Sequence, residues 1–305
     1  MNIFQLVTQQ IKVLIAQWPM RCPVRRLQFA GCPWGSDPMA MSAHDDMPQS
    51  SATPVRSPRQ EEKWQEREAP LLDLTHHILE EEGFAGFNME RLVKASDVSK
   101  GTVYNHFSSK EDCLAALCIR GMHSLADMFR RARAFDGTSR EKALAIHFAY
   151  RLHLKMHPTL SMSLISARTA SFAEKTSPER AEKLRQGDSE LFVLAFEVIQ
   201  DAARAGDLEL TDDMQQVVIT FLNWSVSYGI NMLASTGFDP AVSQMLEEKN
   251  IALMGANVLL DGIGMKPLSK DWDYRASWDR IARELFADEI RLIAEGASPA
   301  NAGEK

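Results

Sequence analysis

Apolar residues recur at helical spacing through most of the chain, and no strand-like alternation bounded by turns appears after about residue 110. Leu71, Leu74 and Ile78 fall on one face of a first helix, which Pro70 suits as its first residue and Gly83 as its end. Cap residues, glycines and prolines predict further helices over 89–96, 100–107, 109–135, 138–157, 159–173, 178–205, 211–235, 239–261 and 273–295. The expected fold class is all-α.

Side chains that can cap a helix precede several of these segments. Asn88 and Ser99 stand before the two short helices. The run Ser108-Ser109-Lys110-Glu111 predicts a capping box that starts the next helix at about Ser109, and Thr138 with Glu141 predicts a second one. Two short helices joined by a tight turn and packed on a longer first helix form a helix-turn-helix. We therefore expect this motif within residues 64–110.

The second short helix has a predicted buried face and a predicted polar face. Val103 and Phe107 are four residues apart and share the buried face, so Thr102, Tyr104, Asn105 and His106 are expected to point outward. Such side chains suit phosphates and base edges. The helix start before Lys110 offers free N–H groups and a positive dipole end, which suits a phosphate. The alternative is that Tyr104 and His106 are ordinary surface residues.

These residues carry a family resemblance. The run DVSKGTVYNHFSSKE, residues 97–111, resembles the signature of TetR-family transcriptional regulators, roughly G-V-S-x-G-T-x-Y-x-H-F-x-S-K-E, and the resemblance covers about residues 64–125. Asp97 replaces the glycine of the turn, at modest cost because aspartate can adopt left-handed geometry. Leu92-Val93 replaces the usual Ile-Ala pair of the preceding helix.

The resemblance implies a set of DNA contacts, which are mostly contacts to phosphates. The residues it assigns to them are Thr102, Tyr104, His106 and Lys110. It also implies that Ser99 and Lys100 begin the recognition helix and that Asn105 occupies a position that varies with the operator. Gly101 is expected to let the backbone approach the groove closely.

Composition and charge limit the classes of function. The chain is 45% hydrophobic and 25% charged, which is typical of a globular protein. Its 34 basic and 41 acidic residues give a net charge of −7, which argues against a protein that coats nucleic acid without selectivity. Acidic residues gather at 61–68 and 80–82, away from the recognition helix, so we expect a focused basic patch. Arg56, Arg59 and Lys63 are candidates for additional arm contacts with DNA.

Other chemistry finds little support in the chain. The four cysteines form no CxxC pair, which argues against a disulfide scaffold or a zinc site and fits a reducing cytosol. His153 and His157 have metal-ligand spacing, but no HExxH motif contains them and Pro158 disrupts the turn. We expect no metal, no cofactor and no catalytic residue. No apolar stretch approaches the roughly 20 residues of a membrane span, so no membrane partner is expected.

The pattern divides the chain into four parts. The pattern predicts an unstructured extension over residues 1–60, with an amphipathic surface helix over 3–18 as the alternative. Met39, Met41 and Met47 are candidate translation starts within it. Residues 61–110 form the helix-turn-helix domain, residues 111–296 a helical effector-binding and dimerisation domain, and residues 297–305 a disordered tail.

The helical body contains candidates for a dimer interface and for a ligand site. One apolar stripe is Val217, Phe221, Trp224, Tyr228 and Met232, and a second is Leu253, Ala256, Leu260 and Ile263. The family resemblance places the dimer interface there, with Phe221, Trp224, Leu253, Ala256 and Leu260 as its residues; an intramolecular core is the alternative. Candidate ligand residues are Tyr150, Met156, Met162, Arg168, Phe192, Trp224 and Tyr228. No role is predicted for the helix over 273–295.

The leading hypothesis is a homodimeric, ligand-responsive repressor that binds a palindromic operator in double-stranded DNA. A largely apolar small molecule would act as its effector. The competing hypothesis is an α-helical enzyme or small-molecule-binding protein that no longer binds DNA. The chain has no GxGxxG, P-loop, GxSxG or HExxH motif, which argues against an enzyme.

Overall fold

The computed structural model describes residues 57–158, 160, 167, 169–235 and 239–295. Regular structure within these residues is helical, with no strand among them, and the predicted all-α fold class is confirmed. The predicted extension before residue 57, the tail after 295, and the candidates Met162 and Arg168 lie outside the described residues. The helices are α2 (Pro58–Gly86), α3 (Met89–Ala95), α4 (Lys100–His106), α5 (Lys110–Arg133), α6 (Ser139–Met156), α8 (Ala170–Ala173), α9 (Pro178–Ala205), α10 (Gln216–Ser235), α11 (Pro240–Glu248), α12 (Ile251–Gly262), α13 (Tyr274–Leu285) and α14 (Ala287–Ala294).

Several helix boundaries that depend on a local cap agree with the sequence. Thr138 and Glu141 form the predicted capping box of α6. Asn88 caps α3 by accepting a hydrogen bond from the Arg91 N–H at 3.0 Å. Gly206, with φ 78°, ends α9 in the left-handed conformation that favours glycine.

The first helix is longer than predicted. It begins at Pro58 rather than at Pro70, which lies inside it, so the last residues of the predicted extension are helical. Gly83, with φ 69°, interrupts the helix as predicted, but a further turn continues to Gly86. The additional turns at the start of α2 bring Trp64 against α4, which is a contact that the sequence pattern did not indicate.

Two predicted long helices are each divided. Asn250, with φ 49°, separates α11 from α12, and its side chain caps α12. Phe286 separates α13 from α14, and its buried ring stacks on Phe148 with 5.5 Å between the centroids. The helix predicted from Thr211 begins at Gln216. Of the helix predicted over 159–173, the structure describes Leu160, Ala167 and residues 169–173, and the last of these include α8.

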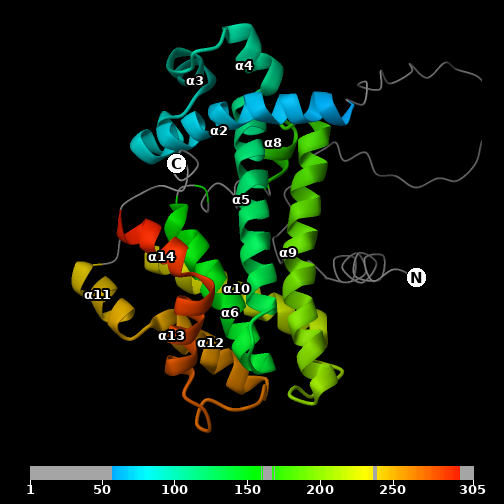
Figure 1. The fold of residues 1–305 in the computed structure, drawn as a ribbon, viewed down its shortest axis with the longest axis vertical. Helices are drawn as coiled ribbons and strands as arrows, with labels where there is room; N and C mark the ends of the chain where they lie inside the picture. The colour runs from blue at the N-terminus through cyan, green and yellow to red at the C-terminus, as the bar shows by residue number, and fades with distance from the viewer. Residues whose placement is uncertain (1–56, 159, 161–166, 168, 236–238, 296–305) are drawn as a thin grey trace, which may run out of the picture. The chain divides into compact units, whose positions relative to one another are not determined.

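Two clusters of buried apolar side chains hold the described helices together, and α5 contributes to both. Residues from Cys113 to Met122 join the core beneath α2, α3 and α4, and residues from Leu125 to Ala132 join the core of α6, α9, α12 and α13. Figure 1 shows α5 running from one group of helices to the other. The domain boundary predicted at residue 110 therefore falls at the start of a helix that both cores share.

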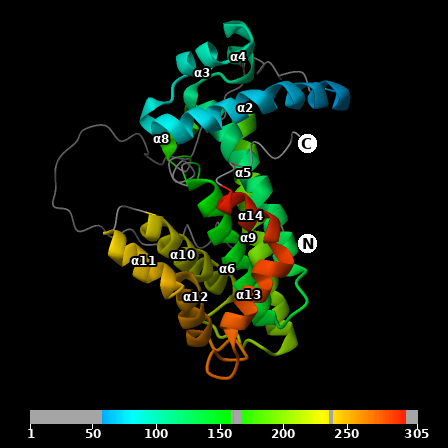
Figure 2. The ribbon, with the colours of Figure 1, turned by 60° about the vertical axis from the view of Figure 1, so that its left-hand side comes forward.

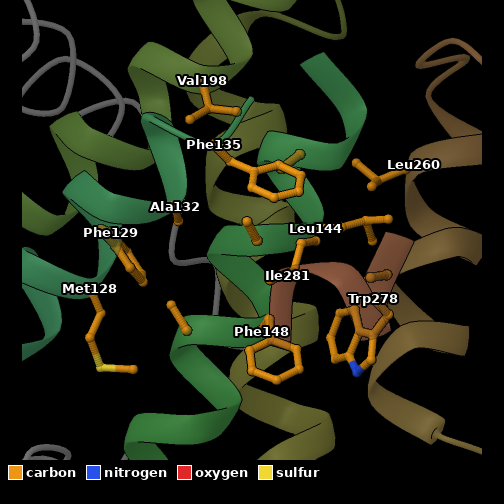
Figure 3. Close-up of a cluster of buried hydrophobic side chains, with 14 of the residues drawn as sticks. Met128, Phe129, Ala132, Phe135, Leu144, Phe148, Val198, Leu260, Trp278 and Ile281 are labelled. Carbon is orange, nitrogen blue, oxygen red and sulfur yellow. The ribbon is translucent and has the colours of Figure 1, made fainter. Parts of the chain in front are cut away.

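The final helices belong to the core of the body. Trp278 and Ile281 of α13 are buried, and the Trp278 ring lies 4.9 Å from that of Phe148 on α6. Figure 3 shows these side chains gathered with Leu144 and Phe135 between the ribbons. The segment that had no predicted role thus covers one face of α6.

One helix of the described residues, Gln216–Ala234 in α10, has the length and composition of a membrane span, contrary to the expectation of none. Its interspersed serines and asparagines concealed this feature in the sequence. The helix contacts α6, α9 and α12, but only 22% of this segment is buried. Much of its apolar surface therefore remains uncovered in the single chain.

Candidate DNA-binding surface

The helix-turn-helix is held by a small buried core. Leu92 of α3, Val103 of α4 and Phe107 just after α4 are all 0% exposed. They pack with buried residues of α2 and α5 in one cluster. Ser99 caps α4 by accepting a hydrogen bond from the Thr102 N–H at 3.2 Å. The predicted motif is therefore present, with α4 in the place of a recognition helix.

Most of the predicted DNA-facing residues lie together on the outer face of α4. Ser99, Lys100, Gly101, Tyr104 and Asn105 are exposed, and Thr102 is half-buried. The Ser99 and Thr102 hydroxyl groups are 2.9 Å apart. The Lys100 ammonium lies 5.6 Å from the centre of the Tyr104 ring, which is one helical turn further along α4. This distance is within the range of a cation–π interaction. This face presents a cation, hydroxyl groups and an amide to the solvent.

Gly101 lies where its own protein leaves room for a larger side chain. A Cβ atom at this position would meet only the Ser99 Oγ at 3.7 Å, which is an ordinary van der Waals contact. Neither φ nor packing within the described residues requires glycine here. The space is therefore available to a groove or phosphate that approaches the backbone.

The expectation that His106 points outward is wrong. It is 4% exposed and packed against the tilted ring of Trp64 with 3.9 Å between ring centroids, and its Nδ1 lies 3.4 Å from Glu68 Oε2. His106 follows Val103 by three residues and therefore shares the buried face of the helix. The sequence pattern missed Trp64 and Glu68 because the helix was not expected to extend to them.

Lys110 lies at the start of α5 and is half-buried. Its ammonium donates a hydrogen bond to the Phe84 carbonyl at 2.8 Å and lies 4.5 Å from the centre of the Phe84 ring. Burial lowers the pKa of Lys110 below its ordinary value, although the Glu111 carboxylate acts in the opposite direction. The lysine therefore links α5 to the end of α2 next to the exposed face of α4.

The cap of α5 differs from the predicted one. Ser109 Oγ accepts a hydrogen bond from the Asp112 N–H at 2.9 Å, and the Asp112 carboxylate accepts one from the Ser108 N–H at 3.0 Å. Asp112, rather than Glu111, is the residue three positions after the cap. The predicted capping box is therefore not formed, because the Asp112 carboxylate accepts from the N–H of Ser108 and not from that of the cap residue Ser109.

The candidate dimer residues divide between surface and core. Phe221 is 53% exposed and Trp224 is half-buried, but Leu253, Ala256 and Leu260 are buried within the chain. The second predicted stripe was therefore assigned to the wrong face of its helix. The exposed apolar side chains of α12 are Met254 and Val258, at 47% and 71% exposure.

The described ligand candidates are half-buried and lie on three helices of the body. Tyr150 and Met156 belong to α6, Phe192 to α9, and Trp224 and Tyr228 to α10. Two surface grooves, of about 330 and 520 Å³, lie elsewhere, the first along α12 and the second between the starts of α6 and α13. None of the five residues lines either groove.

His153 and His157 remain close in space, with ring centroids 4.9 Å apart. Burial lowers the pKa of His153 to about 4, although a hydrogen bond from its ring to the Gly121 backbone carbonyl acts in the opposite direction. Within the described ranges no group of three or more metal-binding side chains is assembled.

Comparison with known proteins agrees with this geometry. Residues 71–117 match the model of the bacterial regulatory proteins of the tetR family. An HTH-type transcriptional regulator of Staphylococcus aureus (strain bovine RF122 / ET3-1) is 22% identical over 154 residues, covering 50% of this chain and 76% of the relative.

Solved structures share the helical fold. A protein of unknown function from Rhodococcus sp. RHA1 aligns with a TM-score of 0.52 at 20% identity, covering 65% of this chain and 95% of the other. A TetR/AcrR-family transcriptional regulator from Thermobifida fusca YX-ER1 aligns with a TM-score of 0.50 at 17% identity, covering 65% and 98%. Together with the helix-turn-helix and its exposed polar face, these matches show that residues 71–117 are similar to the bacterial regulatory proteins of the tetR family and that the helical fold is shared with solved structures.

Proposed function

We propose that the protein is a homodimeric repressor that binds a palindromic operator and leaves it when a small-molecule effector binds the helical body. The observation that carries this proposal is the outer face of α4, where Lys100, Tyr104 and Asn105 are exposed around a glycine that the protein's own packing does not require. A helix of this kind enters the major groove, and a two-fold dimer reads two half-sites.

The proposed dimer surface consists of the exposed faces of α10 and α12, without the buried residues Leu253, Ala256 and Leu260. The two helices pack side by side in Figures 1 and 2. Phe221 and Leu233 of α10 and Met254 and Val258 of α12 expose apolar side chains. Burying such a surface against a second copy removes apolar area from water, which favours association.

The proposed effector is a largely apolar small molecule. The half-buried aromatic residues Tyr150, Phe192, Trp224 and Tyr228 support a site in the body, because ligand sites combine apolar walls with a few polar groups. An effector releases DNA only through a higher affinity for the conformation that does not fit the operator. We propose that this takes place in the cytoplasm.

Selection of bound fragments from a random DNA pool tests the operator proposal. The expected product is a palindrome whose half-sites lie about one helical turn, or 34–36 Å, apart. Recovery of DNA with no repeated half-site would contradict the proposal.

Single-base variants of the selected operator then separate two kinds of contact. Asn105→Ala should weaken discrimination at one or two base pairs by about 1–3 kcal/mol each. Tyr104→Phe should weaken binding to all sequences alike, because the lost hydroxyl is assigned to a phosphate. Uniform loss in the Asn105 variant would place that side chain on the backbone instead.

The competing function, a small-molecule-binding protein or enzyme without DNA binding, makes the opposite prediction. It requires that the full chain bind random, genomic and selected DNA equally weakly. A gel-shift series with genomic fragments distinguishes the two functions.

A further inference from the structure

An arginine from the helical body reaches the end of the recognition helix. Arg180, in the first turn of α9, donates a hydrogen bond from Nη1 to the carbonyl of His106, the last residue of α4, at 2.8 Å. The same Nη1 lies 2.7 Å from Asp112 Oδ2, and Nη2 lies 2.7 Å from Glu68 Oε2. One guanidinium therefore joins α2, α4 and α5 to α9.

The bonds lie in a largely buried setting. The side chains of Arg180, Glu68 and Asp112 are 13%, 16% and 2% exposed. The guanidinium also lies 5.1 Å from the centre of the Phe107 ring. Burial by itself would raise the pKa of Asp112, but Arg180 and the backbone N–H groups of Ser177 and Ser108 outweigh it and lower that pKa. A buried guanidinium that is hydrogen-bonded to several acceptors holds their positions more firmly than a surface ion pair does.

The segment before α9 makes further bonds to the same place. The Ser177 N–H donates to Asp112 Oδ1 at 3.0 Å, and Ser109 Oγ donates to the Lys175 carbonyl at 2.6 Å. The final carbonyls of a helix have no partner within the helix. In α4 one of these carbonyls, that of His106, is satisfied by a residue of the body, 74 positions later in the chain. The start of α9 is therefore hydrogen-bonded directly to the end of α4.

We propose that Arg180 is a positioning residue for operator binding: it fixes the end of the recognition helix to α9 and so couples the helix to the state of the body. The inference rests on the proposed operator binding. Arg180 directs both terminal nitrogens to protein acceptors and its side chain is only 13% exposed, so we expect it not to bind a phosphate. Its loss should therefore change how well α4 fits the operator without changing the number of counterions that DNA binding releases.

The test compares two arginines of the same helix. Arg180→Met removes the link while keeping an unbranched side chain, and Arg185→Met is the matched control because Arg185 is 72% exposed and forms an ion pair with Glu182 of its own helix. Binding of the selected operator is titrated at several salt concentrations. We expect Arg180→Met to bind roughly tenfold more weakly with an unchanged salt slope, and Arg185→Met to bind as the unaltered protein does. Equal affinities of the two variants, or a reduced salt slope for Arg180→Met, would overturn the proposal.

Two further measurements separate positioning from general stability. Arg180→Lys keeps the charge but cannot hold three acceptors in a fixed fork, so it should recover only part of the affinity. Glu68→Gln combined with Arg180→Met should lose less than the two single variants added together, because both act through one link. Additive losses would contradict this coupling.

Amide hydrogen exchange provides a readout that needs no DNA. Arg180→Met should speed exchange in residues 100–107 while the core of α6 and α13 keeps its protection. Unchanged exchange in α4 would overturn the proposal even if the operator were never found. Failure of the unaltered protein to select any operator would instead count against the proposed function alone.

Discussion

A glycine in the first turn of a helix costs stability, so its presence in α4 indicates a use outside the free protein. Alanine would fit at position 101 against the Ser99 hydroxyl without a clash. In an exposed helix position, alanine is more favourable than glycine by up to about 1 kcal/mol. Gly101 therefore lowers the stability of α4 in the free protein, and we expect it to make operator binding tighter.

Gly101→Ala should raise the free energy of unfolding and weaken operator binding at the same time. The added methyl group stabilises α4 but keeps its backbone from approaching the groove. Urea unfolding and operator titration measure the two effects separately. Val98→Ala, an exposed change in the preceding turn, serves as the control. Unchanged or tighter operator binding would show that close approach is not the reason for the glycine.

Lys110 should matter both to folding and to DNA binding. Lys110→Ala removes the hydrogen bond to the Phe84 carbonyl and should cost about 1 kcal/mol of stability. It should also weaken binding to all DNA sequences alike and lower the salt slope by about one counterion per half-site. Lys183→Ala, a surface lysine of α9, is the control. A stability loss with an unchanged salt slope would assign Lys110 to structure alone.

At the scale of elements, helix boundaries set by a local residue could be predicted from the sequence, whereas boundaries set by a tertiary contact could not. Pro178 and Gly206 bound α9 as the sequence indicated, because a proline and a glycine act on their own turn. The break at Phe286 depends instead on a ring that stacks on Phe148, far away in the chain. Spacing predicted the exposure of Tyr104 and Asn105 on α4 but not the burial of His106. The contact of Arg180 with α4 could not be predicted, because only the folded chain brings α9 to it.

The corrected faces of α12 predict different outcomes for two nearby substitutions. Val258→Glu places a charge on the 71% exposed face and should leave the chain folded but monomeric. Leu260→Glu buries a charge at a fully enclosed position and should prevent stable folding. Sedimentation and circular dichroism distinguish the two results. Ile290→Glu on α14, an exposed aliphatic residue outside the proposed surface, should stay dimeric; a dimeric Val258 variant would exclude α12 from the interface.

At the scale of the whole molecule, the two cores depend on one continuous helix and on polar groups buried beside it. His76 and His147 are buried and their pKa values are lowered, chiefly by desolvation. Burial, with smaller contributions from electrostatic interactions with His153, His76 and Arg120, lowers the pKa of His157 to about 3. The folded chain thus keeps several histidines neutral in conditions where the unfolded chain protonates them.

This difference sets the sign of the pH dependence. Below about pH 6.5 the unfolded state binds protons on these histidines that the folded state does not, so acid favours unfolding. Each such histidine should contribute a slope of about 1.4 kcal/mol per pH unit until its folded pKa is reached, which for His153 is about 4. Carboxylates with lowered pKa values, such as Asp112 and Glu141, contribute stability that is lost at lower pH still.

Urea unfolding between pH 7.5 and about pH 4.5 should therefore show the free energy of unfolding falling steadily as the pH is lowered. His153→Gln should flatten this slope and His123→Gln, an exposed change on α5, should not; a flat profile in the unaltered protein would show that the buried histidines do not govern its acid stability.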